Sequence, residues 1–84
     1  MRRDNLHGNL PNPGDYGRGP DGKWFGCPPV GVDDNGFPLM ANLSAHEVTE
    51  HADGTLTVSP SIEVWGGSRR WHGYLKAGTW TEVD

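Results

Sequence analysis

Hydroxyl, thiol and imidazole groups are the first candidates for chemistry in this sequence. The possible nucleophiles are Ser59, Ser61, Ser68 and Cys27. His72 is the best-placed residue to act as their base. However, no Gly-x-Ser-x-Gly motif is present, and no nucleophile stands at a strand-to-helix turn that would expose it. Acidic pairs such as Glu47 and Glu50 are more simply explained as a solvated face than as a general acid and base. We therefore predict that the protein is not an enzyme.

The histidines and the cysteine are also the possible metal ligands, which are His7, Cys27, His46, His51 and His72. Zinc sites are usually marked by close pairs such as Cys-x-x-Cys or His-x3-His, and neither pair occurs. His46 and His51 lie five residues apart, so a strand would send them to opposite faces. We predict no metal site and no other cofactor, with a degenerate metal site as the weaker alternative.

A glycine-rich segment followed by two arginines is a possible anion site. Gly66, Gly67 and Ser68 could present backbone amides to a phosphate, and Arg69 and Arg70 come directly after them. The same residues are also expected at an ordinary hairpin tip with surface arginines. The sequence favours this second interpretation.

An alternating strip is the strongest candidate for a binding surface. Arg70, His72 and Tyr74 share one face of a predicted strand, and Trp65 is expected near them across a hairpin. Such a surface is suited to stacking nucleotide bases or to anchoring a protein partner. The predicted partner- or ligand-binding residues are Trp65, Arg69, Arg70, His72, Tyr74 and, from the N-terminal segment, Tyr16.

The elements that must position this strip are short strands with turn residues between them. Strands are expected at residues 55–59, 61–65, 70–75 and 79–83, preceded by 23–27 as an edge strand, 37–41 and 46–51. Asn35-Gly36 and Asp53-Gly54 are typical of tight hairpin turns, and Pro60 predicts a bend or bulge. The predicted fold is all-β: an antiparallel meander of five to seven strands, curled into a small barrel or sandwich.

Residues 1–22 differ from the rest in being rich in glycine and proline and having no apolar periodicity. They are expected to form an extended arm, and residues 23–84 the β-domain. Two alternatives stay open for the arm. It packs on its own domain, with Tyr16 as the contact, or it lies across a neighbouring subunit or partner.

Composition limits both the core and the partners. The expected core contains ten residues, Phe25, Leu39, Val48, Leu56, Val58, Ile62, Val64, Trp71, Leu75 and Trp80. This is a small core for 84 residues, which suggests stabilisation by a partner. A net charge of −4 argues against double-stranded DNA as that partner. The single cysteine excludes an internal disulfide, and no segment is apolar enough to span a membrane.

The C-terminal half resembles a small family of unknown function that is widespread in tailed bacteriophages. The matching positions are Thr57, Pro60, Ser61, Ile62, Trp71, His72, Gly73 and Gly78, within about residues 46–83. The resemblance implies a short β-domain and a viral gene product. Many relatives resemble metal binders with paired cysteines, whereas this chain has only Cys27 and carries Trp71 before the histidine.

Together these observations predict a non-enzymatic bacteriophage protein that acts through protein contacts, most simply a small virion component such as a head decoration or accessory protein. Its partners would be other phage structural proteins or further copies of itself, in the virion or the host cytoplasm. The alternative is a binder that counters host defence by sequestering a nucleotide signal or blocking a defence protein.

Overall fold

The fold, seen in a computed structural model, is described for residues 2–6 and 10–83, and within them it contains strands and no helix. The seven strands of this part are β1 (Tyr16–Arg18), β2 (Trp24–Gly26), β3 (Ala41–Asn42), β4 (Glu47–Glu50), β5 (Leu56–Gly66), β6 (Arg69–Lys76) and β7 (Thr79–Glu82). The prediction of an all-β fold is confirmed. The described residues include no helix that could cross a membrane.

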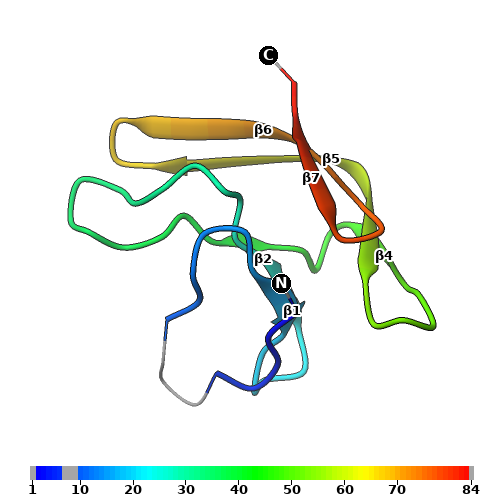
Figure 1. Ribbon diagram of the computed structural model, residues 1–84. Coiled ribbons are helices and arrows are strands. Elements are labelled where there is room, and N and C mark those ends of the chain that lie inside the picture. Colours follow the sequence, from blue (N-terminus) through cyan, green and yellow to red (C-terminus); the bar gives the residue numbers. More distant parts are fainter. Residues whose placement is uncertain (1, 7–9, 84) are drawn as a thin grey trace.

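The strands form two antiparallel sheets, one with the order β1-β2-β3 and one with the order β4-β5-β6-β7. The long β5–β6 hairpin extends over the smaller sheet, and β4 and β7 lie at the far end of that hairpin (Figure 1). The sheets do not close into a barrel, so of the two predicted arrangements the sandwich fits. β2 is the central strand of its sheet, and the expectation that residues 23–27 form an edge strand is therefore wrong.

Local turn chemistry determines the larger sheet. Gly54 has a φ of +88° in the turn between β4 and β5, where the amide of His51 donates to the carbonyl of Thr55 at 2.8 Å. The pairing of β5 with β6 shifts register between Val58 and Ile62, which confirms the bulge predicted at Pro60. β5 therefore runs as one bulged strand through two segments that were expected to be separate.

The core lies between the two sheets. Eight of the ten predicted core residues are buried, whereas Val48 and Trp80 are half-buried and pack against the cluster. The buried hydrophobic core also contains four residues outside the expected list, Tyr16, Cys27, Ala41 and Leu43. Phe37, at the start of the strand expected over residues 37–41, is 52% exposed.

Most of residues 1–22 belong to the domain and do not extend away from it. β1 pairs with β2 in register from Tyr16 opposite Gly26, and Tyr16 is only 4% exposed. The indole nitrogen of Trp80 in β7 donates to the carbonyl of Gly14 at 2.8 Å. The described part of the segment thus packs on its own chain. A division at residue 22 would separate β1 from its partner strand. The sequence did not indicate β1, because a strand of three residues has too little periodicity.

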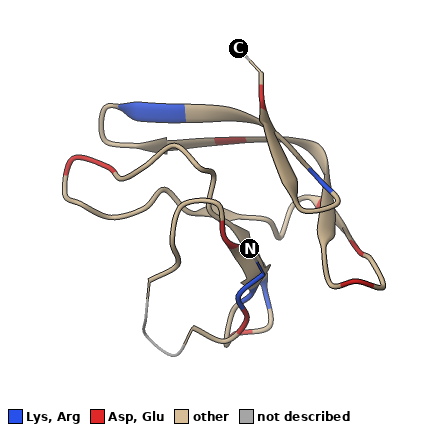
Figure 2. Cartoon of the chain, viewed as in Figure 1, with Lys and Arg blue, Asp and Glu red and all other residues tan. Residues whose placement is uncertain are grey.

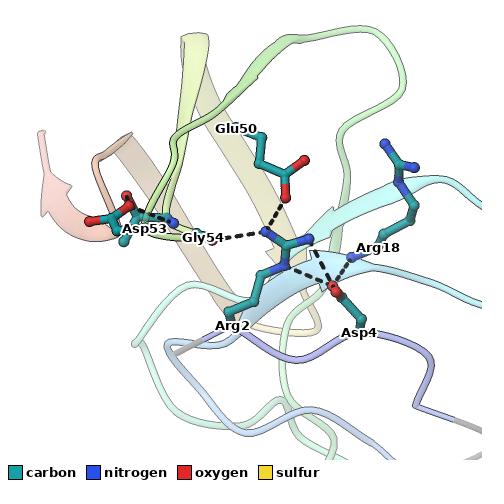
Figure 3. A network of polar contacts seen from close by, with 7 residues as sticks. Arg2, Asp4, Arg18, Glu50, Asp53 and Gly54 are labelled. Atoms are coloured by element: carbon teal, nitrogen blue, oxygen red, sulfur yellow. Dashed lines mark hydrogen bonds and ion pairs between the residues drawn. The ribbon is translucent and has the colours of Figure 1, made fainter.

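Arg2 fastens the start of the chain to the turn between β4 and β5 (Figure 3). Its guanidinium donates to Asp4 at 2.8 and 3.1 Å, to Glu50 at 2.9 Å and to the carbonyl of Gly54 at 2.8 Å. It also lies 5.2 Å from the centre of the Trp24 ring. These contacts join the two sheets at their surface.

A loop, residues 28–40, runs alongside the β5–β6 hairpin, and we call it the strap (Figure 1). Its tip is the predicted Asn35-Gly36 turn, with a φ of +82° at Gly36 and a hydrogen bond of 2.7 Å from the amide of Asp33 to the carbonyl of Phe37. The strand predicted at 37–41 is reduced to a single bridge between Val32 and Pro38, followed by β3. Proline removes a donor from this segment, which shortens its pairing.

Candidate functional site

One exposed side of the β5–β6 hairpin brings the predicted strip together. Arg70, His72 and Tyr74 alternate with buried residues along β6, and Trp65 of β5 is the register partner of Arg70. We call the outward side formed by Glu63, Trp65, Arg70, His72 and Tyr74 the aromatic face. It is built on the two longest strands, whose opposite side is the core, so its backbone is held firmly.

The Trp65 end of the aromatic face combines a large ring with a fixed charge. Trp65 is 63% exposed, the highest value among the large hydrophobic residues that stand out at the described surface. The guanidinium of Arg70 lies 5.9 Å from the centre of this ring and donates to Glu63 at 2.6 and 3.1 Å. The ion pair with Glu63 places Arg70 beside the ring, and the end presents both an apolar and a cationic group.

The Tyr74 end has a similar combination. Tyr74 is 37% exposed, and the ammonium of Lys76 lies 5.4 Å from the centre of its ring. Between the two ends, Nε2 of His72 lies 3.0 Å from Oγ of Ser61. The face thus alternates aromatic rings with hydrogen-bonding groups along about 13 Å of strand between Arg70 and Tyr74, at roughly 3.3 Å per residue.

The hairpin tip is an ordinary turn with surface arginines, as the sequence favoured, but its donors are occupied from within the chain. The amide and hydroxyl of Ser68 donate to the two carboxylate oxygens of Asp34, at 3.2 and 2.8 Å. Arg69 donates to the carbonyl of Val30, at 3.3 Å, so this side chain also has a partner on the strap. An anion is held at this tip, and it is a carboxylate of the same chain.

Two predicted contact residues lie away from the aromatic face. Tyr16 is buried between the sheets and has no surface to offer a partner. Arg69 points to the strap instead of lying beside Trp65. Of the six predicted residues, the structure therefore collects four, Trp65, Arg70, His72 and Tyr74, on one surface.

The described residues do not assemble a metal centre. No group of three or more histidine, cysteine, aspartate or glutamate side chains is arranged to hold a metal among them. Two imidazoles lie next to Ser61. Nε2 of His46 is 3.2 Å from the carbonyl oxygen of Ser61, and Nε2 of His72 contacts the Ser61 hydroxyl. Nδ1 of His46 is buried without a hydrogen-bond partner. A nucleophile and a base at this separation still need a third group that orients the base.

Cys27 has no access to solvent. Its side chain is 0% exposed, and burial raises the pKa of its thiol to about 11, with a smaller contribution from the nearby Asp15. A thiol with such a pKa is almost wholly protonated at neutral pH and is a poor nucleophile or ligand. Cys27 acts as a small apolar core residue.

A hollow of about 370 Å³ lies over the smaller sheet, lined among others by Leu6, Trp24 and Met40. Its lining is mainly apolar, and Asp21 and Lys23 are the charged residues in it.

The charges are divided between elements (Figure 2). Basic residues mark the two ends of β6, at Arg69 and Arg70 and at Lys76, whereas acidic residues occupy the strap tip and the region of β4. Within the aromatic face the charges of Arg70 and Glu63 balance, and Lys76 adds a positive charge beside its Tyr74 end. The net charge of −4 argues against binding of nucleic acid, but it does not exclude a contact between this face and a small acidic group on a partner.

The residues that fix the site were not all visible in the sequence. Alternation placed Arg70, His72 and Tyr74 on one face, but the partners Glu63, Ser61 and Asp34 depend on register and on the path of the strap. Asp34 lies 34 residues from Ser68, and no local pattern indicates such a contact.

Comparison with known proteins adds no relative. No protein-family model, no curated protein and no solved structure matches this chain.

Proposed function

We propose that the protein is a non-enzymatic bacteriophage protein that acts through protein contacts made by its aromatic face. The observation that carries the proposal is the placement of Trp65, Arg70 and Tyr74 together, exposed, on a firmly held sheet. Tryptophan, tyrosine and arginine are the residues most enriched among those that dominate protein interfaces. The ion pair of Arg70 with Glu63 limits the conformational freedom that this side chain has to lose on binding.

We further propose that it serves as a small virion component, such as a head decoration or accessory protein, present in the virion or the host cytoplasm. The resemblance of residues 46–83 to a phage family supports the viral origin. The partner would be another phage structural protein or a second copy of the chain. Tyr16 and β1 pack on their own domain, so the contact is assigned to the aromatic face and not to an arm.

The alternative is a binder that sequesters a nucleotide signal or blocks a host-defence protein. Blocking a defence protein would be a protein contact of the same kind, whereas binding a nucleotide calls for donors at the hairpin tip. In the structure the amide and hydroxyl of Ser68 bond to Asp34, and Arg70 bonds to Glu63. A nucleotide would first have to displace one of these internal partners. The protein contact needs no such displacement, and we place it first.

The test is incorporation into virions. The double variant Trp65→Ala, Tyr74→Ala removes both rings, and each ring of this kind contributes on the order of 2 kcal/mol to a contact, or about 30-fold in affinity. Copies per purified particle, counted by quantitative mass spectrometry, should fall to near zero while the melting temperature is kept. The matched control is Phe37→Ala, which removes a ring that is 52% exposed on the strap. Equal incorporation of all three proteins would overturn the proposal.

A further inference from the structure

The contact between the strap and the hairpin tip has the features of a ligand site that is already filled. The site's donors are the amide and the hydroxyl of Ser68, which bind separate oxygens of one carboxylate, at 3.2 and 2.8 Å. Such paired donors to one oxyanion are typical of phosphate and carboxylate recognition. The occupant, Asp34, belongs to the same chain.

Gly67 makes room for the occupant. A Cβ atom at this position would lie 2.6 Å from Oδ2 and 2.9 Å from Cγ of Asp34, and the φ of Gly67 is +61°. Only glycine combines this backbone conformation with so close an approach of an oxyanion. The tip is therefore shaped around an anion and not merely closed by a turn.

A cationic side chain, that of Arg69, lies next to the site. Arg69 follows Ser68 directly and donates to the carbonyl of Val30 at 3.3 Å, a long hydrogen bond made by an exposed side chain. Asp34 and Ser68 are themselves exposed, so solvent and small ions reach the contact. An entering dianion would attract Arg69 and repel Asp34 and its neighbour Asp33.

We propose that the hairpin tip is an oxyanion-binding site for a phosphate group, occupied in the resting protein by the carboxylate of Asp34, and that phosphate binding releases the strap tip. A phosphate near pH 7.5 carries close to two charges and more acceptor oxygens than a carboxylate. It competes against two exposed hydrogen bonds from neutral donors, whose net contribution is modest because water can replace them. The proposal does not depend on the protein contact of the aromatic face, because the phosphate site is formed by Gly67 and Ser68 at the hairpin tip and by Asp34 of the strap.

The occupied state lowers the apparent affinity for phosphate. If Asp34 fills the site about nine-tenths of the time, the apparent dissociation constant is about tenfold above that of the open site. Removing the carboxylate should therefore reveal binding that the wild-type protein shows only weakly. The variant Asp34→Ala does this without placing a new group at the tip.

The experiment is a titration of the isotope-labelled full chain with inorganic phosphate, followed by amide chemical shifts. In Asp34→Ala, the Gly67 and Ser68 amides should shift saturably, with a dissociation constant about tenfold lower than in the wild-type protein. In the wild-type protein, the Asn35 and Gly36 amides should shift together with those of the tip as the strap is released. Sodium chloride at equal ionic strength is the control for screening, and Ser68→Ala in the Asp34→Ala background should weaken binding again.

Asp34→Asn provides a second, nearly isosteric variant should the alanine variant lose its dispersed spectrum. Tip amides that do not respond saturably in either variant, or that respond with equal affinity in the variants and the wild-type protein, would overturn the proposal. Two further arms, AMP and O-phosphoserine, carry the same phosphate group from different sources. The arm that saturates the tip at the lower concentration identifies the source.

Discussion

Replacing Tyr16 with alanine should remove the main apolar link between the first strand and the rest of the protein. Tyr16 is 4% exposed and pairs with Gly26 across β1 and β2. Its hydroxyl lies 2.6 Å from the position that a Cβ of Gly78 would occupy. The side chain therefore reaches from the smaller sheet to the turn between β6 and β7.

The size of the effect follows from this burial. Truncation of a buried aromatic residue to alanine costs about 3–5 kcal/mol in the free energy of unfolding. A domain of 84 residues has a total stability of about 4–13 kcal/mol. The variant should thus lose a large part of its stability, and its melting temperature should fall by roughly 15–30 °C.

The assay is thermal unfolding followed by circular dichroism, with urea unfolding as a second measure. The matched control is Leu10→Ala, because Leu10 belongs to the same N-terminal segment but is 51% exposed, and its loss should change stability by less than about 0.5 kcal/mol. A melting temperature of Tyr16→Ala within about 3 °C of the wild-type value would refute the packing of this segment on its own domain.

Three further predictions concern charge, the thiol and the hairpin tip. The hydrogen bond from Arg2 lowers the pKa of Asp4, so the stability that this carboxylate contributes should be present above about pH 4 and be lost as the pH falls further. The urea midpoints of Asp4→Asn and the wild-type protein should therefore differ above about pH 4 and converge below it. Because burial raises the pKa of Cys27 to about 11, alkylation at pH 8 should be about a hundredfold slower in the native than in the urea-unfolded protein, as measured by mass spectrometry, and equal rates would contradict its burial. Gly67→Ala should lower the melting temperature more than Gly54→Ala, because both residues have positive φ but only Gly67 has a carboxylate within 3 Å of the added methyl group.

Local features of the sequence were sufficient to predict the larger sheet. Asp53-Gly54 permits the positive φ of a tight turn, and the alternation of Leu56, Val58, Ile62 and Val64 sets which side of β5 faces the core. The four exposed members of the predicted site follow from the same alternation along β6. Such features depend on near neighbours in the chain, and these neighbours are visible in the sequence.

Features that depend on distant contacts were not predictable. β1 has three residues and a single large buried side chain, Tyr16, so it leaves no periodic pattern. The pairing of Asp34 with Ser68 joins residues far apart in the chain, and a sequence shows only that both types of group exist. Hence the sequence offered an open anion site or an ordinary hairpin tip as alternatives, and neither included the carboxylate that contacts Ser68 in the structure.

The most direct test of the central claim is the reactivity of Trp65 in purified phage particles. Trp65 is 63% exposed in the free protein and should be readily oxidised by a tryptophan-selective reagent, whereas Trp71 is 3% exposed and serves as an internal reference. If the aromatic face is the contact surface, Trp65 should be protected in the particle to nearly the level of Trp71. A chain that is absent from the particles, or a Trp65 that is oxidised there as fast as in the free protein, would contradict the account.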